Sequence, residues 1–122
     1  MRTLNKVSLI GNLGAAPTEI RHLEGGVTVC RITIATTESF VDKSGTTHHS
    51  TEWHTVILWR GLAELAAKYL KKGSLVYVEG KLKNRQYEDK EGTIKYVTEI
   101  IAEQLIMLDP KSKQTITVPP MP

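Results

Sequence analysis

The sequence has few of the features that mark small secreted domains or membrane proteins. Its single cysteine, Cys30, cannot form a disulfide within the chain. Apolar runs reach only about four residues, as from Val56 to Trp59, whereas a membrane-spanning helix needs about 20. The start, MRTLNKVSLIG, places Lys6 inside any hydrophobic segment and offers no small-residue cleavage site. We therefore expect a cytoplasmic protein without a membrane span or secretory signal.

Groups that could support catalysis are also scarce. The adjacent pair His48 and His49 lacks a neighbouring cysteine or carboxylate cluster, so it is a weak metal signal. Asp42, Asp89 and Asp109 are too scattered to suggest the metal site of a nuclease. Neither GxxxxGK nor GxGxxG occurs, which removes the common phosphate-binding loops. The sequence predicts no enzyme activity, no metal and no cofactor.

The net charge of +3 is too small to identify a partner, but its distribution is uneven. Across residues 68–85, six basic residues stand against one acidic residue, Glu79. The basic residues are Lys68, Lys71, Lys72, Lys81, Lys83 and Arg85. Such a run is often only a solvated surface, and a polyanion partner is the alternative.

Hydrophobic periodicity predicts a mostly β domain over residues 1–109. Five strands are expected, at 4–10, 27–36, 51–59, 75–87 and 94–108. The fourth is expected to be kinked at Gly80, and the turn sequence DKEG at 89–92 joins it to the fifth. Gly11 and Gly14 are interpreted as a turn that ends the first strand, and residues 19–23 as a short extension that pairs back onto it. Polar residues between Phe40 and Thr51 predict a long exposed hairpin loop.

Between the third and fourth strands the period changes to that of one short amphipathic helix at residues 62–70. This order is expected for a five-stranded oligonucleotide-binding (OB) barrel, although other small β-barrels would have the same count. Residues 110–122 contain four prolines and no periodicity, which predicts a short flexible C-terminal tail.

Aromatic residues make up only 6% of the chain, yet several follow polar or basic neighbours. Four are of this kind: Phe40, Trp53, Trp59 and Tyr87. Any single ring on a half-buried strand is most simply explained by packing. As a set, rings interleaved with cations suit an unpaired nucleic acid strand, whose bases have flat apolar faces on a charged backbone.

Several segments closely resemble the bacterial single-stranded DNA-binding protein family. They are NKVSLIGNLG at 5–14, ITIATTESF at 32–40, TEWHTVILW at 51–59, LAELAAKYLKKGS at 62–74, VYVEGKLKNRQY at 76–87 and YVTEI at 96–100. The resemblance covers about residues 3–108 in order. It implies an OB fold, a homotetramer, and binding of single-stranded DNA without sequence specificity during replication, recombination and repair, in the cytoplasm with the nucleoid.

The resemblance also implies roles for particular residues. The stacking aromatics match Phe40, Trp53, Trp59 and Tyr87; the commonest family pattern is Trp, Trp, Phe, Trp, and each replacement retains a π face. His54 matches a histidine at the subunit interface. The phosphate contacts match Lys6, Arg31, Lys43, Arg60, Lys72, Lys83 and Arg85.

One departure concerns the end of the chain. Family members usually continue into a flexible linker and an acidic tip that recruits replication and repair enzymes, whereas this sequence has no acidic residue after Asp109. A naturally short form and a truncated one both remain open, and recruitment of partners through an acidic tail is doubtful.

Two functions from other classes remain open. A protein-interaction module on the same barrel, such as a primosome-type relative, would use the surface for partners. An RNA chaperone is less favoured, because the sequence lacks the aromatic-rich KGFGFV-like signature of RNA-binding domains.

Overall fold

The computed structural model describes residues 1–109, which form six strands, one α-helix and one short 3-10 helix. In chain order the elements are β1 (Val7–Leu13), β2 (Thr18–His22), η1 (Glu24–Gly26), β3 (Thr28–Val41), β4 (Thr47–Trp59), α1 (Gly61–Tyr69), β5 (Leu75–Glu88) and β6 (Ile94–Met107). The tail predicted at 110–122 lies outside the described residues.

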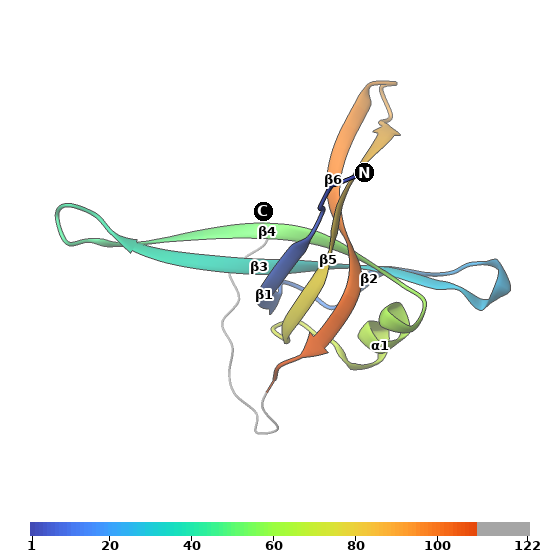
Figure 1. Cartoon of the computed structure of the whole chain (residues 1–122), viewed down its shortest axis with the longest axis horizontal. Coiled ribbons are helices and arrows are strands. Elements are labelled where there is room, and N and C mark those ends of the chain that lie inside the picture. The colour runs from blue at the N-terminus through green and yellow to red at the C-terminus, as the bar shows by residue number, and fades with distance from the viewer. Residues whose placement is uncertain (110–122) are drawn as a thin grey trace.

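Five of the strands close into a barrel. The sheet order is β1-β5-β6-β4-β3-β2, and β1 also pairs with β3, which joins the two ends of the five-strand circuit. All strand pairings are antiparallel except the short one between β4 and β6, which is parallel at Val56 and Ile57. The expected all-β OB barrel is confirmed (Figure 1).

The core follows from the two-residue alternation of the strands. In the parts of β3 and β4 that lie in the barrel, alternate residues are buried, as at Ile32, Ile34, Val56 and Leu58. Equivalent residues of β5 complete the same cluster. The alternate residues of these strands therefore face outward and are free to form a binding surface.

Helix α1 packs its small face against this core. Ala63 and Ala66 are fully buried, and the helix contacts β3, β4 and β6. It lies between β4 and β5, which correspond to the third and fourth strands expected from the sequence. Their numbers are higher by one because β2 is a separate strand. Among the described residues, no helix is long and apolar enough to cross a membrane.

The interpretation of Gly11 as part of a strand-ending turn is wrong. Strand β1 continues through Gly11 to Leu13, where it meets β3. A Cβ at Gly11 would lie 2.3 Å from the carbonyl oxygen of Ala35, so glycine is needed for the close approach of two strands. Gly80 has the same role in β5, at the predicted kink, where a Cβ would lie 2.1 Å from the carbonyl oxygen of Ile101.

The expected extension at residues 19–23 pairs with a different strand. Strand β2 is antiparallel to β3, with a register shift between Thr18 and Arg21. Glu19 lies in this irregularity with φ 52°, a left-handed conformation that is uncommon for a non-glycine residue. The tight turn at Gly25 and Gly26 explains the difference, because it connects β2 directly to β3.

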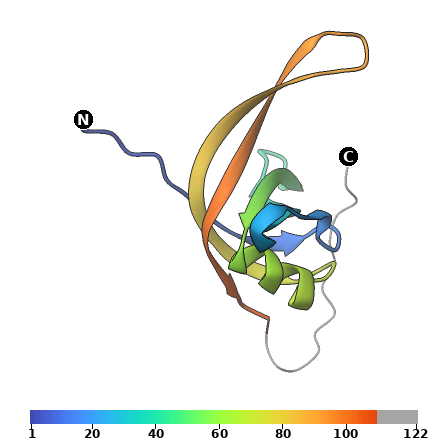
Figure 2. The same ribbon diagram turned by 90° about the vertical axis from the view of Figure 1, so that its right-hand side faces the viewer.

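The long loop expected at 41–50 is only partly correct, because residue 41 and residues 47–50 are strand and the turn is confined to residues 42–46. Strands β3 and β4 pair without interruption from Val29 opposite Trp59 to Val41 opposite Thr47. Polar side chains stabilise this exposed ribbon across the strands, as Thr37 does with Thr51 and Ser39 with His49. The result is an arm that projects far from the barrel, and the β5–β6 hairpin forms a second arm in another direction (Figures 1 and 2).

The two arms end in the same turn. Residues 42–46 read DKSGT and residues 89–93 read DKEGT. In each turn the aspartate carboxylate accepts hydrogen bonds from two backbone N–H groups, two and four residues later, at 2.9–3.0 Å. The glycine of each turn has a positive φ, 85° at Gly45 and 81° at Gly92. Each turn therefore presents a lysine, Lys43 or Lys90, at an arm tip.

Candidate nucleic-acid interface

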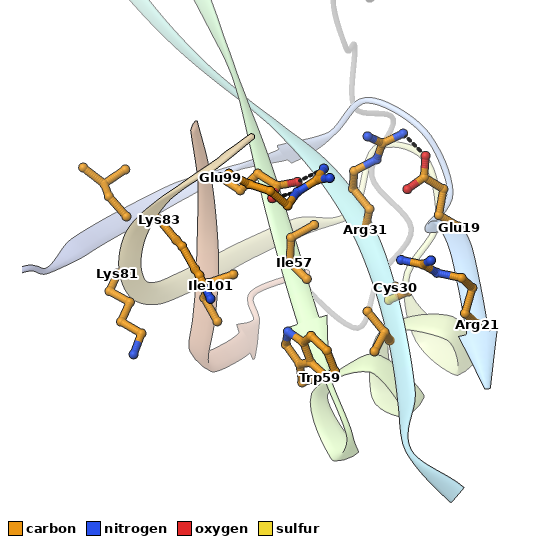
Figure 3. A pocket seen from close by; sticks show the side chains of 13 residues that line it. Glu19, Arg21, Cys30, Arg31, Ile57, Trp59, Lys81, Lys83, Glu99 and Ile101 are labelled. Atoms are coloured by element: carbon orange, nitrogen blue, oxygen red, sulfur yellow. Dashed lines mark hydrogen bonds and ion pairs between the residues drawn. The ribbon is translucent and has the colours of Figure 1, made fainter. Parts of the chain in front are cut away.

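An open groove of about 1060 Å³ crosses the outer face of the barrel. Strands β2 to β6 all contribute outward residues to it, and its lining combines apolar, cationic and acidic side chains. The lining residues are Glu19, Arg21, Val29, Cys30, Arg31, Ile57, Trp59, Lys81, Leu82, Lys83, Arg85, Glu99 and Ile101 (Figure 3).

The centre of the groove is apolar and its two sides are basic. Ile57 and Trp59 alternate on the outward face of β4, and Trp59 is 43% exposed. Lys81 and Lys83 come from β5 on one side, and Arg31 comes from β3 on the other (Figure 3). The groove thus has the width of several strands, an exposed ring and cations on both sides.

Two arginines of the groove are paired with carboxylates. Arg31 forms an ion pair with Glu19, and both side chains are substantially exposed. Arg85 donates from Nε to Oε1 of Glu99 at 3.0 Å and from Nη2 to Oε2 at 3.3 Å. The hydrogen bonds and the charge of Glu99 raise the pKa of Arg85, so its guanidinium remains charged.

The four predicted stacking rings do not lie on one continuous surface. Trp59 is in the groove, and Trp53, half-buried, faces the same side of β4 six residues earlier. Tyr87 lies on the same side of β5 as Lys83 and Arg85, toward the tip of the β5–β6 arm, and is 46% exposed. A strand could contact these three rings only by running from the groove along the arms.

Phe40 faces the opposite side of the β3–β4 arm. On β3, Phe40 lies across from His48, and Ala35 lies across from Trp53. Ala35 and Phe40 are five residues apart, and an odd spacing along a strand places two side chains on opposite sides. Phe40 and Trp53 therefore face opposite sides of the arm. The ring of Phe40 stacks on His48 with centroids 5.1 Å apart and planes inclined by 20°. His48 Nε2 is 2.6 Å from Oδ2 of Asp42 in the tip turn. Phe40 is thus part of a separate exposed platform on this arm.

Only some of the residues predicted to contact phosphates lie in the groove. Arg31, Lys83 and Arg85 line the groove, whereas four others lie elsewhere on the surface: Lys6, Lys43, Arg60 and Lys72. Lys6 Nζ lies 3.4 Å from Oε1 of Glu79. The hydrogen bond from Tyr77, followed by Lys6, lowers the pKa of Glu79, so this carboxylate remains charged.

Arg60 has an unusual backbone. It follows Trp59 directly, with φ 57° and ψ −124°, and its carbonyl accepts the hydrogen bond of Glu64 N–H in the first turn of α1. Its own N–H donates to the carbonyl of Thr28 at 2.7 Å. These bonds hold the chain where β4 turns sharply into the helix, a conformation that suits glycine better than arginine.

The remaining sequence candidates are packed within the chain. His54 is half-buried, and its Nε2 lies 2.9 Å from the hydroxyl of Thr36. Cys30 is 1% exposed, and burial raises the pKa of its thiol, which disfavours the reactive thiolate. Within residues 1–109, no group of three or more His, Cys, Asp or Glu side chains is placed to hold a metal ion.

Several groove residues were not among the sequence candidates. Lys81 was visible as part of the basic stretch, and strand alternation places it on the same side as Lys83 and Arg85. Arg21 could not be placed, because the pairing of β2 was predicted incorrectly. Glu99 gave no signal, since one glutamate in an alternating strand is normally solvent-exposed.

The comparisons with known proteins agree with this architecture. The family model described as "Single-strand binding protein family" matches residues 4–108. The chain is 47% identical over 112 residues to single-stranded DNA-binding protein 1 of Xylella fastidiosa, covering 91% of this chain and 82% of the relative. It is 42% identical over 113 residues to a single-stranded DNA-binding protein of Neisseria meningitidis, covering 93% of this chain and 64% of the relative.

Two solved structures are similar in fold. One, a Plasmodium falciparum SSB in complex with ssDNA, has a TM-score of 0.80 at 36% identity, covering 89% of this chain and 98% of that one. The other, a deletion mutant of the single-stranded DNA binding protein from Thermus aquaticus, has a TM-score of 0.73 at 34% identity. That match covers 88% of this chain and 52% of the other.

Proposed function

Because the chain belongs to the single-strand binding protein family, we propose that it binds single-stranded DNA through the groove around Trp59. Binding is independent of sequence and protects the strand during replication, recombination and repair. The observation that supports this most strongly is one groove that combines an exposed tryptophan with cations from both sides, Arg31 and Lys83. The protein acts as a binding protein and not as an enzyme, in the cytoplasm with the nucleoid.

The two kinds of residue have separate tasks. The cations attract the phosphate backbone and release its counterions, so affinity falls as salt is added. Trp59, with Ile57 and Ile101 beside it, offers an apolar surface on which a base can stack. Every base has a π face, whereas this surface reads no base edge, which explains binding without sequence preference.

The arms extend the binding path beyond the groove. Trp53 continues the groove side of β4 toward the β3–β4 arm, and Tyr87 continues the groove side of β5 toward the other arm. Lys43 and Lys90 at the two tips can contact phosphates further along the strand. Phe40 faces the other side of its arm, so it contacts DNA only if the strand wraps around that arm.

The ion pair with Glu19 affects how Arg31 can bind a phosphate. Glu19 must be displaced, or must share the guanidinium, before a phosphate can bind there. Both side chains are exposed, so the pair is weak and is screened by salt. Arg31 is therefore available to DNA at modest cost.

A homotetramer is supported by two surfaces that no other part of the described chain covers. Strand β1 pairs with β5 from Val7 to Asn12 but meets β3 only at Asn12 and Leu13, so one edge of residues 7–11 has no strand beside it among the described residues. A second copy of β1 can pair there about a two-fold axis. His54, near the place where β1 separates from β3, is close to this edge.

The second surface is an apolar row on the outer face. Ile10, Tyr77 and Ile106 are consecutive partners across β1, β5 and β6, and Ile10 is 60% exposed. One interface at the strand edge and another at this face give four copies with closed symmetry. Light scattering coupled to size exclusion should give the mass of four chains, and Ile10→Asp should give two; a wild-type mass of one chain would contradict this assembly.

The function is tested by titrating the protein with poly-dT while tryptophan fluorescence is recorded. We expect strong quenching, because Trp59 stacks on bases, and an affinity that falls with salt. A duplex of equal length is the control and should bind much more weakly, since its bases are not available for stacking. Equal affinity for duplex and single strand would refute the proposal.

A further inference from the structure

We propose that Glu99 is a positioning residue that holds the guanidinium of Arg85 ready for a DNA phosphate. This inference rests on the proposed function, because it assigns a role within the same groove. Glu99 is 5% exposed and is the only charged residue that is fully buried among residues 1–109. A buried carboxylate beneath a surface that binds a polyanion requires an explanation, because its charge opposes the ligand.

The geometry provides that explanation. Glu99 lies opposite Lys83 in the β5–β6 register, and Arg85 reaches it diagonally from the next pair on the same face. Two hydrogen bonds, at 3.0 and 3.3 Å, join both carboxylate oxygens to Nε and Nη2 of Arg85. The dashed lines at Glu99 in Figure 3 mark this pair. This bidentate pair fixes the plane of the guanidinium as well as its position.

The pair leaves part of the guanidinium available. Nε and Nη2 use one edge of the planar group, so Nη1 and the second hydrogen of Nη2 remain as donors. The Arg85 side chain is 54% exposed while the Glu99 side chain is 7% exposed, so the free edge is accessible from the groove. A phosphate can therefore bind Arg85 without displacing Glu99.

The pair of Arg31 with Glu19 is a useful contrast. There the carboxylate is 53% exposed, so it competes with phosphate for the arginine and gains nothing from burial. The Glu99 side chain is only 7% exposed and lies beneath the groove surface, so it does not compete with a phosphate for the free edge of Arg85. It restricts the rotamers of Arg85 before DNA arrives, which reduces the entropy lost when the long side chain is immobilised.

Replacing Glu99 with glutamine separates positioning from simple charge. Removing a negative charge near DNA strengthens binding if only Coulomb attraction matters. Positioning predicts the opposite, a loss of about fivefold in affinity for an oligo-dT, because Arg85 becomes free to rotate. Glu103→Gln is the matched control: it removes the same charge from an exposed position on the same strand and should bind at least as tightly as wild type.

Two further variants connect the effect to Arg85. Arg85→Gln should weaken binding and reduce the salt slope by about 0.7, the value for one phosphate contact on a single strand. Adding Glu99→Gln to Arg85→Gln should cause no further loss, because the arginine to be positioned is absent. Glu99→Asp keeps the charge but shortens the side chain, so it should also weaken binding, and it serves if Glu99→Gln does not fold.

Fluorescence anisotropy of labelled oligo-dT, at several salt concentrations, measures all of these variants. The proposal holds if Glu99→Gln weakens binding in wild type but not in the Arg85→Gln background. It is overturned if Glu99→Gln binds as tightly as wild type or tighter, or if the two losses add. Failure of wild type to prefer oligo-dT over duplex would instead refute the proposed function, so the two failures are distinguishable.

Discussion

The role of Trp59 can be tested by replacing its ring while retaining its packing. Trp59 is 43% exposed, so roughly half of the side chain is packed against the barrel and half is available to a base. Trp59→Ala would remove both contributions and confuse stability with binding. Trp59→Leu keeps an apolar side chain without a π face, and Trp59→Phe keeps a π face.

The magnitude follows from the energy of one stacked base. Loss of a stacking ring costs about 1 to 3 kcal/mol, so Trp59→Leu should weaken binding of oligo-dT by about 5- to 150-fold. Arg31 and Lys83 remain in this variant, so its salt dependence should equal that of wild type. Trp59→Phe should lie within about threefold of wild type, since phenylalanine also stacks.

The assay is anisotropy of a labelled oligo-dT at two salt concentrations, with the thermal midpoint of each variant measured by circular dichroism. A Trp59→Leu variant that binds as tightly as wild type would refute stacking at Trp59. Equal losses of affinity in Trp59→Phe and Trp59→Leu would also refute it, because a π face would then have no role.

Three other predictions concern the backbone and the arm tips. Arg60→Gly should raise the thermal midpoint, because a strained φ of 57° with ψ −124° costs about 1 to 3 kcal/mol for a non-glycine residue. Its affinity for oligo-dT should fall if Arg60 contacts a phosphate. An unchanged or lower midpoint would contradict the strain. Gly80→Ala should unfold the protein or greatly lower its midpoint in circular dichroism, since the new Cβ would lie 2.1 Å from a backbone oxygen of Ile101; a wild-type midpoint would show that the β5–β6 pairing is not as described. Hydrogen bonds from Ser44, then from His48, lower the pKa of Asp42 from 3.8. The charged Asp42 therefore stabilises the tip turn fully above about pH 4, and this stabilisation is lost as the pH falls through the lower pKa of the folded state. An NMR titration that gives Asp42 an ordinary pKa would contradict this.

Local patterns were sufficient to predict most of the secondary structure. The β-branched alternation around Ile32 and the three- and four-residue spacing in the helix each dominate their segment, and both elements were found. The turn at 89–92 was equally clear from its sequence, DKEG. The kink at Gly80 was confirmed as a register shift.

The errors arose where a residue's role depends on a distant strand. Gly11 resembles a turn residue in isolation, but its function is to admit the carbonyl of Ala35, which is remote in sequence. Similarly, the polar run after Phe40 resembles a loop because an arm exposed on both faces has no hydrophobic alternation. Glu99 could not be singled out, since its burial requires Arg85 on the neighbouring strand.

The predicted site residues also separate into those that the sequence places correctly in the groove and those whose position depends on strand pairing. The sequence resemblance named Trp59, Arg31, Lys83 and Arg85, and these four do lie in one groove. Strand parity, which requires the β3–β4 register, places Phe40 on the other side of its arm. The DNA contacts of all these residues remain predictions.

Photo-crosslinking determines directly whether single-stranded DNA crosses the groove at Trp59. Oligo-dT that carries bromodeoxyuridine is irradiated in complex with the protein, and the crosslinked residues are identified by mass spectrometry. We expect crosslinks at Trp59, with Tyr87 and Trp53 as further sites along the arms. Crosslinks confined to the apolar row of Ile10, Tyr77 and Ile106 would contradict binding at Trp59.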